Sequence, residues 1–375
     1  MYSRSHQEFQ PDIIGITVLP TNFTEACKIA ELAKATDSNI LVIVGGPATT
    51  FLPRRELEDS HFDMCVIGEG EQTLTSFLEM RQRKSDCLYT IPGLLIRDSR
   101  GMLTTTGNST LVYDLDTVPF PDYTLITNLG SYTTVGLVTS RGCPSNCSFC
   151  SVQRLYSGNY RQRSAQNVVD EIKSITEILV TQGMSRQLTI VDDTFTADRS
   201  RVFQICESMQ QMDHAIPWDC CSRVLDLKDE KMVSAMKLAG CAGVFVGIES
   251  GSPRTLKEIR KGHTVEHIRE VITILNAHGI KVSIGVILGF PWETEENIRE
   301  TITLLKSLPI DGASVTFATP LPGTDLFELA DELGYNPGGI PLEAFNFSRP
   351  TISPLPDSTL YRFREEVYEA IDNSK

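Results

Sequence analysis

Residues 140–150 read SRGCPSNCSFC and place three cysteines in one short loop. The thiols of Cys143, Cys147 and Cys150 follow the spacing C-x3-C-x2-C, and the next cysteine along the chain is Cys206. Protein thiolates usually bind all four irons of a cubane [4Fe–4S] cluster. A loop with three thiols holds three irons and leaves the fourth open. An open iron can chelate a small molecule, and the reduced cluster can then transfer one electron to it.

A structural zinc site is the alternative interpretation of the three thiols. Such a site needs four protein ligands, and no histidine lies between His61 and His214 to complete it. In a chain without an export signal, ten cysteines indicate metal ligands, redox groups or buried side chains rather than a disulfide framework. Seven cysteines outside the loop are interpreted as small buried hydrophobic residues: Cys27, Cys65, Cys87, Cys206, Cys220, Cys221 and Cys241.

The cysteine loop lies within a regular alternation of predicted strands and helices. Apolar strands are predicted at 134–139, 187–191, 218–222, 243–248, 281–288 and 313–318. Helical patterns lie between them near 164–182, 199–212, 229–239, 264–278 and 294–307. Six such repeats predict an α/β fold, a partial TIM-like (βα)6 barrel whose site lies at the C-terminal mouth of its strands.

The N-terminal part has the same rhythm on a smaller scale. Strands are predicted at 12–19, 40–44 and 63–67, with a helix at 23–34 and another from Leu74 onward. This pattern predicts a parallel sheet built from βαβ units. Ligands of such sheets bind beyond the carboxyl ends of the strands.

We expect four segments along the chain. Residues 1–87 form the N-terminal α/β domain, and residues 88–130 form a linker with one hairpin. Residues 131–330 form the barrel. Residues 331–375 form a short C-terminal helical extension, which carries no cysteine and so no second cluster.

Charge and composition exclude several classes of protein. The chain has 375 residues with 48 acidic and 34 basic side chains, so its formal charge of −14 disfavours a nucleic-acid partner. Residues 1–12 lack the apolar core of a signal peptide, and no segment approaches 18 consecutive apolar residues. We therefore expect a cytoplasmic protein without a transmembrane segment.

The cysteine spacing and Phe149, just before the third cysteine, resemble the signature of the radical S-adenosylmethionine (SAM) superfamily. The resemblance covers residues 131–330 and implies that Cys143, Cys147 and Cys150 hold a [4Fe–4S] cluster. It implies that SAM binds the fourth iron and is reductively cleaved to methionine and a 5′-deoxyadenosyl radical. It also implies a small organic or lipid-like substrate and an external one-electron reductant of the ferredoxin or flavodoxin type.

The resemblance assigns SAM contacts to residues that follow later strands. Asp193 would contact the amino group of the cofactor, although aspartate also serves well as a helix N-cap. Arg223 would bind the carboxylate, with a surface ion pair as the alternative. Glu249 would accept hydrogen bonds from the ribose hydroxyls, and Ser250 would add one more.

The segment GVILGFPWE at residues 285–293 resembles the G-x-I-x-G element that lies near adenine in this family. Ile287 would pack on the base, and Gly289 would let the backbone approach it. An ordinary core strand followed by a turn is the alternative for each residue.

The N-terminal domain resembles the flavodoxin-like cobalamin-binding domain that precedes many radical SAM enzymes. Thr17 and Leu19 match its S-x-L element, and Gly45 and Gly46 match its GG element. In that family a further strand and helix come first, so the sheet is expected to be incomplete, with unpaired backbone groups at its edge. A degenerate domain, a partner chain that completes the sheet and a start further upstream are the three explanations.

The leading functional hypothesis is a radical SAM enzyme of the cobalamin-domain branch, whose members methylate unactivated carbon or phosphorus or carry out ring-forming and oxidative steps on small molecules and lipids. A radical SAM oxidoreductase without cobalamin is the first alternative. A methylthiotransferase acting on transfer RNA is a second, because Cys27, Cys65 and Cys87 give the N-terminal domain three cysteines. An iron–sulfur electron carrier without catalytic activity is a third.

Overall fold

The computed structural model describes residues 10–51, 57, 60–84, 87–98, 100–126, 129–183, 187–214, 216–339 and 345–372. The chain divides into two compact units. The first contains residues 1–113, 321–323 and 336–348, and the second contains residues 114–320, 324–335 and 349–375.

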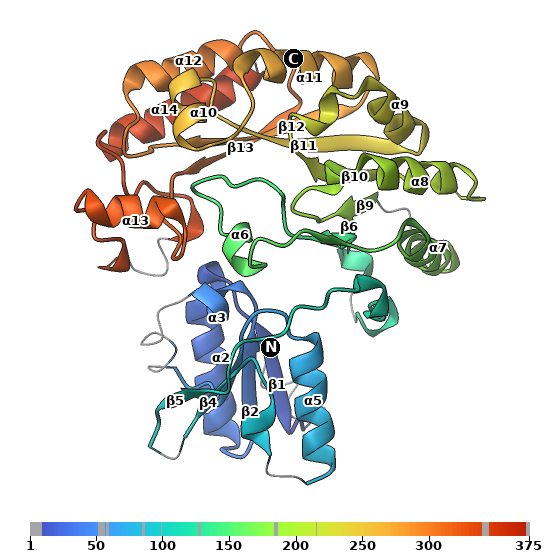
Figure 1. The fold of residues 1–375 in the computed structure, drawn as a ribbon, viewed down its shortest axis with the longest axis vertical. Helices are drawn as coiled ribbons and strands as arrows, with labels where there is room; N and C mark the ends of the chain where they lie inside the picture. Colours follow the sequence, from blue (N-terminus) through green and yellow to red (C-terminus); the bar gives the residue numbers. More distant parts are fainter. Residues whose placement is uncertain are drawn as a thin grey trace. The chain divides into compact units, whose positions relative to one another are not determined.

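The first unit is a five-stranded sheet with the strand order β1-β2-β3-β4-β5. Its strands are β1 (Ile13–Thr17), β2 (Leu41–Gly45), β3 (Met64–Val66), β4 (Leu94–Arg97) and β5 (Leu103–Thr105). Helices α2 (Phe23–Thr36) and α3 (Pro47–Phe51) cover one face, and α5 (Glu71–Gln82) covers the other (Figure 1). Strands β1, β2 and β3 are parallel, as the sequence predicts.

The hairpin expected within the linker at 88–130 forms, but it extends this sheet. Strand β4 pairs with β3 in antiparallel register, and β5 pairs with β4. The pairing satisfies the backbone groups at the open side of β3. At the other side of the sheet, β1 pairs only with β2 within the described residues.

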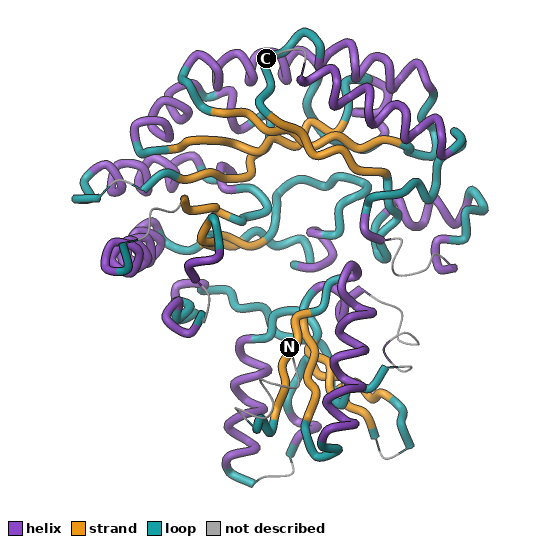
Figure 2. Tube along the Cα trace, turned by 180° about the vertical axis from the view of Figure 1, so that it is seen from behind, coloured by secondary structure: helices purple, strands orange, loops and turns teal. Residues whose placement is uncertain are grey.

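The second unit contains the predicted partial barrel, a curved parallel sheet with the order β13-β12-β11-β10-β9-β6. Its strands are β6 (Thr134–Leu137), β9 (Gln187–Ile190), β10 (Trp218–Ser222), β11 (Cys241–Glu249), β12 (Lys281–Leu288) and β13 (Gly312–Phe317). Its convex face is covered (Figure 2) by α7 (Ala165–Thr181), α8 (Arg199–Gln210), α9 (Glu230–Leu238), α11 (Val265–Ala277), α12 (Glu295–Leu305) and α14 (Asp357–Asp372).

Shorter elements complete the second unit. They are the small antiparallel pair β7 (Ser140–Arg141) and β8 (Arg161–Gln162) and the helices α6 (Val152–Leu155), α10 (Pro253–Glu258) and α13 (Asp325–Glu332). In the two units together, 3-10 helices occupy Pro20–Asn22, Leu88–Thr90, Leu115–Thr117, Tyr123–Leu125, Leu129–Ser131, Phe195–Ala197, Asp226–Lys228 and Pro337–Gly339.

Local sequence explains where the barrel helices begin. A Ser, Thr or Asp side chain accepts a backbone N–H at the start of each of several helices, which satisfies groups that the helix leaves unpaired. These N-caps are Ser164, Asp198, Asp229, Thr264, Thr294 and Thr324.

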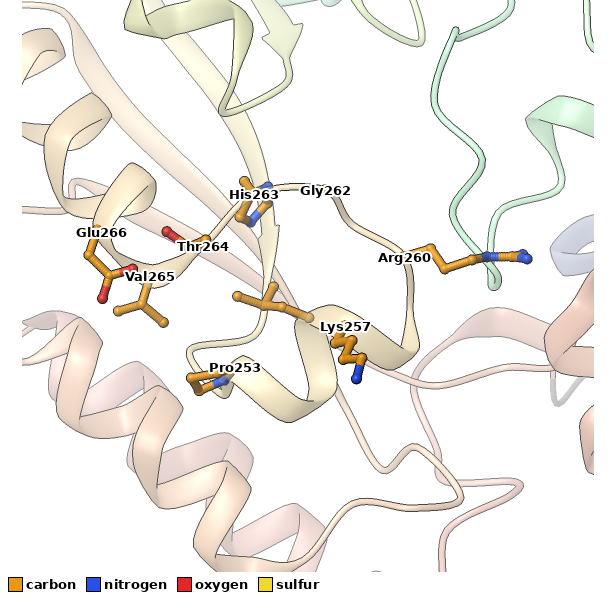
Figure 3. A pocket seen from close by; sticks show the side chains of 9 residues that line it. Pro253, Lys257, Arg260, Gly262, His263, Thr264, Val265 and Glu266 are labelled. Carbon is orange, nitrogen blue, oxygen red and sulfur yellow. The ribbon is translucent and has the colours of Figure 1, made fainter.

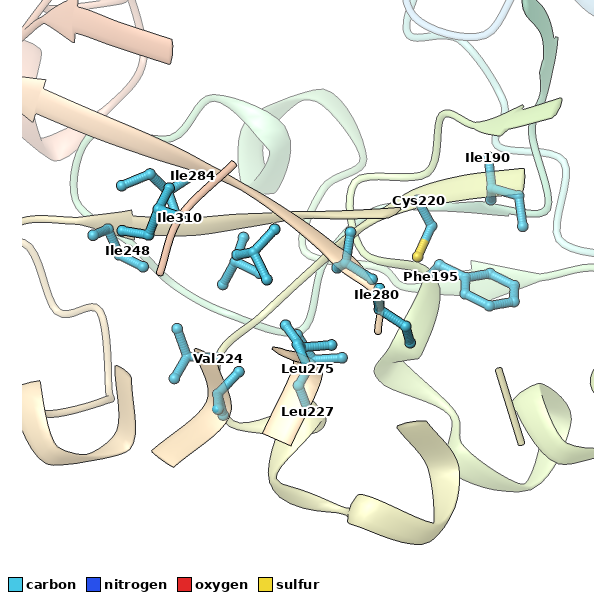
Figure 4. Packing of buried hydrophobic residues seen from close by; sticks show 14 of the residues in the cluster. Ile190, Phe195, Cys220, Val224, Leu227, Ile248, Leu275, Ile280, Ile284 and Ile310 are labelled. Carbon is cyan, nitrogen blue, oxygen red and sulfur yellow. The ribbon is translucent and has the colours of Figure 1, made fainter. Parts of the chain in front are cut away.

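The main hydrophobic core lies between the curved sheet and its helices. Strand residues such as Ile190, Cys220 and Ile284 pack with Leu227 and Leu275 (Figure 4). Helix α14 belongs to the same core, since its apolar residues Leu360, Phe363, Val367, Ala370 and Ile371 are buried there. The C-terminal segment is therefore part of the barrel rather than an appendage to it. Within the described part of the chain, no helix is both long and apolar enough to cross a bilayer.

Candidate cofactor site

A cavity of about 640 Å³ lies at the carboxyl ends of the central barrel strands. The three cysteines of the 140–150 loop line it, together with polar residues that follow β9, β10 and β11. The polar and charged residues of the wall include Asp193, Cys221, Arg223, Glu249, Lys261 and His263. The site therefore forms where a parallel sheet is expected to bind its ligand.

The cysteine loop is held by backbone contacts on several sides. Gln153 donates its side-chain amide to the carbonyl of Cys143 at 2.6 Å and to that of Ser145 at 2.5 Å. The N–H of Ser148 donates to the carbonyl of Ile259 at 3.1 Å. The φ of Gly142 is +89°, and a side chain there would collide with the Asn159 carbonyl, so only glycine fits.

Two adjacent aspartates tie the start of this loop to the end of β9. Asp192 is buried and accepts hydrogen bonds from the N–H of Thr139 and the hydroxyl of Ser140, each at 2.6 Å. Asp193 accepts the N–H of Gly142 at 3.0 Å and lines the cavity. The cavity wall partly desolvates this carboxyl group, which raises the pKa of Asp193. The following helices are N-capped by other residues, so the alternative role of Asp193 as a cap is excluded.

Arg223 lines the cavity and also forms the ion pair that was its alternative role. Its guanidinium donates to both carboxylate oxygens of Asp226, at 2.9 and 2.6 Å. Its remaining nitrogen donates to the hydroxyl of Ser145 in the cysteine loop at 3.1 Å. Arg223 thus connects β10 to the cysteine loop, with 27% of its side chain exposed.

Glu249 ends β11 in an unusual backbone conformation with φ of +62°, next to a shift in the register with β12. Its Oε1 accepts a hydrogen bond from Nζ of Lys261 at 2.8 Å. The pair crosses directly over Gly247, where a β-carbon would lie 3.1 Å from that nitrogen. Lys261 and His263 come from the loop between α10 and α11.

Three of the predicted SAM contacts lie elsewhere. Ser250 is buried beside Thr301 and is not part of the cavity wall. Ile287 is half-buried against the main core. Gly289 has φ of +84°, and a β-carbon there would contact Leu360 and Ser353, so this glycine makes room for the C-terminal segment.

The predicted cobalamin contacts gather at one end of the first unit's sheet. Thr17 and Gly45 are register partners at the ends of β1 and β2. Gly46 has φ of +108°, and a β-carbon there would lie 2.9 Å from the Val18 carbonyl oxygen. Leu19 is 43% exposed beside this turn. The backbone of the Gly45–Gly46 turn and the exposed side chain of Leu19 therefore lie at the end of the sheet where a ligand of this domain would bind.

Comparison with known proteins gives the family. Residues 137–305 match the model of the radical SAM superfamily, and residues 3–78 match that of the B12 binding domain. The chain is 34% identical over 330 residues to an uncharacterized methyltransferase of Pyrococcus horikoshii, covering 86% of this chain and 70% of the relative. The chain belongs to the radical SAM superfamily.

Two further relatives of this radical SAM protein extend the comparison. An anaerobic magnesium-protoporphyrin IX monomethyl ester cyclase of Rubrivivax gelatinosus is 29% identical over 356 residues, which cover 92% of the chain but only 62% of the cyclase. The solved structure of the radical SAM methyltransferase TsrM from Kitasatospora setae has a TM-score of 0.74 and 20% identity. That match covers 89% of the chain and 68% of TsrM and shows that the fold is shared.

The radical SAM and B12 binding domains imply a [4Fe–4S] cluster, SAM and cobalamin as cofactors. Among the described residues, no three His, Cys, Asp or Glu side chains are close enough to bind one metal ion. In a cubane each iron binds a different thiolate, so the three thiols in the cavity wall can each hold one iron. The cations of Arg223 and Lys261 can compensate thiolate charge in the same wall.

The cysteines of the first unit give no support to the methylthiotransferase alternative. Cys27 lies on α2, Cys65 is buried in β3, and Cys87 is exposed.

Sequence reasoning missed Lys261, His263 and Cys221 as parts of the cavity wall. The segment RKGHT at 260–264 has the appearance of an exposed basic loop, and it follows a helix, α10, that is too short to give a periodic signal. A second cavity of about 600 Å³ lies beside α10 and the start of α11 (Figure 3). It contains no cysteine, and it shares His263 with the thiol-lined cavity.

Glu293 provides a pH-dependent contribution to stability. Its side chain is 1% exposed, and its Oε2 accepts the N–H of Gly289 at 2.6 Å. Burial raises the pKa of Glu293 to about 7 from an ordinary value of 4.5. Between these two values the folded protein keeps a proton that the unfolded chain releases, so stability falls as pH rises through this window.

We expect the substitution Glu293→Gln to remove this pH dependence. A pKa shift of this size corresponds to roughly 3 kcal/mol. The free energy of unfolding of the variant, relative to that of the wild type, should therefore rise by about that much from pH 5 to pH 8. Urea unfolding of the cluster-free chain at the two pH values measures the difference. If the free energy of unfolding changed equally with pH in both proteins, the pKa of Glu293 would not be raised in the folded state.

Proposed function

We propose that this radical SAM enzyme transfers a methyl group from SAM to a small organic or lipid-like substrate with the help of cobalamin. The proposal is carried by one combination: a thiol-lined cavity in the barrel and an N-terminal domain that matches the B12 binding domain. The name of the Pyrococcus horikoshii relative, a methyltransferase, supports the same reaction class.

The chain's own residues would hold and orient the cofactors. When bound, the cluster supplies the electron for SAM cleavage, and cobalamin supplies a methyl carrier. Cys143, Cys147 and Cys150 would bind three irons. Asp193, with one oxygen already engaged by the loop, would offer the other to the SAM ammonium group. Oε2 of Glu249 would accept hydrogen bonds from the ribose hydroxyls, while Oε1 keeps its hydrogen bond from Lys261.

We assign the substrate and the reductant by chemical class. The electron would come from an external one-electron donor of the ferredoxin or flavodoxin type. The apolar share of the cavity wall, which includes Phe149, Val152, Leu225 and Phe245, favours an organic substrate over a highly charged one.

The test is anaerobic reconstitution with iron and sulfide, followed by reduction in the presence of SAM, with and without cobalamin. We expect 5′-deoxyadenosine together with S-adenosylhomocysteine, the second only when cobalamin is added. Deoxyadenosine alone would favour an oxidoreductase or cyclase, the class to which the Rubrivivax gelatinosus relative belongs by name. A full cluster with neither product would favour the electron-carrier alternative.

A further inference from the structure

Lys261 is a buried cation in the wall of the thiol-lined cavity. Only 12% of its side chain is exposed, and its partner Glu249 is 10% exposed. Charges in such a position are weakly screened by water and salt, so their effects reach neighbouring groups. The proposed methyl transfer gives Glu249 a ligand contact but leaves Lys261 without a role of its own.

The backbone brings this lysine close to the cysteine loop. The N–H of Ser148 donates to the carbonyl of Ile259, two residues before Lys261. The lysine Nζ lies 5.8 Å from the centre of the Phe149 ring, a cation–π distance. Phe149 stands between the second and third cysteines, so the ammonium group lies beside the part of the loop that carries these two thiols.

The ammonium end of the ion pair is the one that contacts the cysteine loop, through the ring of Phe149. Lys261 also lines the same cavity as Cys143, Cys147 and Cys150. The cation therefore lies in the wall that the thiols share.

Reduction adds one electron, and therefore one negative charge, to a cluster that already carries thiolate ligands. The reduction potential of such clusters depends on nearby charge and on solvent exposure. A fixed cation beside the thiolates stabilises the reduced form more than the oxidised form. In this reaction one electron passes from the external reductant to the cluster, and no bond forms or breaks.

We propose that Lys261, held in place by Glu249, is a charge-positioning residue that makes reduction of the cluster more favourable. This inference rests on the assignment of Cys143, Cys147 and Cys150 as cluster ligands in the proposed function. Arg223, the other cation of the wall, contacts the cysteine loop at Ser145, whereas Lys261 lies beside Phe149, next to Cys150.

The test is an EPR-monitored redox titration of the anaerobically reconstituted full chain, in the absence of SAM. In Lys261→Met the equilibrium constant for reduction should fall at least tenfold, which corresponds to about 59 mV for a one-electron couple. Lys261→Arg keeps the charge and should stay within threefold of the wild type. Lys228→Met is the matched control, since it breaks the 3.1 Å pair with Glu270, which lies outside the cavity wall.

Lys261→Gln provides a second neutral variant if Lys261→Met fails to take up a cluster, and its equilibrium constant for reduction should also fall at least tenfold. An unchanged potential in whichever of the two variants keeps wild-type iron content would overturn the inference and leave the proposed function intact. A wild-type chain that takes up no cluster would overturn both.

Discussion

Replacing Cys147 with alanine should lower the iron and sulfide content of the anaerobically reconstituted chain at least tenfold and abolish SAM cleavage. Cys147 is 9% exposed and lies in a loop whose neighbouring backbone is held by hydrogen bonds of Ser148 with Ile259 and Leu326. A loop held this tightly cannot move another thiol into the vacant position. Iron and acid-labile sulfide assays, together with the visible absorption of the cluster, measure the loss.

Cys221 provides the matched control for this substitution. It lines the same cavity but lies on β10, and burial raises its pKa above the ordinary thiol value. We expect Cys221→Ala to keep wild-type iron. If Cys221→Ala lost iron while Cys147→Ala kept it, the cluster would use a different set of ligands. All steps need exclusion of oxygen, since a cluster with an open iron is readily oxidised.

The fold could be predicted closely because its periodic signals are strong. The predicted strands 218–222 and 281–288 have the bounds of β10 and β12, and the helical segment predicted within 331–375 contains α14. Buried parallel strands are continuous apolar runs, and the long helices show clear amphipathic spacing. The hairpin at 94–105 was placed in a linker because short strands give no signal of which sheet they join.

The structure brings together those predicted site residues that closely follow a parallel strand. The cysteines, Asp193, Arg223 and Glu249 meet in one cavity because the carboxyl ends of neighbouring strands lie at one edge. Ser250 turns away because Glu249 adopts a positive φ at the register shift. The Lys261–Glu249 pair spans a helix and a loop, and no local sequence pattern reports such a contact.

Asp192→Ala should lower the free energy of unfolding by about 3–5 kcal/mol, the cost of removing one partner from a buried charge network. Asp192 is 2% exposed, and besides its hydrogen bonds to Thr139 and Ser140 it lies 3.8 Å from the guanidinium of Arg201. Arg201 is itself 4% exposed. The substitution therefore leaves a buried cation and three buried donors, the N–H and hydroxyl of Thr139 and the hydroxyl of Ser140, without this acceptor.

Urea unfolding of the cluster-free chain, followed by circular dichroism, measures this effect without interference from the cofactor. Asp193→Ala is the neighbouring control, because its carboxylate faces the cavity and accepts one backbone hydrogen bond, from Gly142. Its cost should be about 1 kcal/mol, the usual value of a single hydrogen bond. Equal losses in the two variants would mean that Asp192 contributes no more than one such bond. A much larger loss in Asp192→Ala would identify it as the anchor that fixes the cysteine loop to the sheet, a role that requires burial and several donors at once.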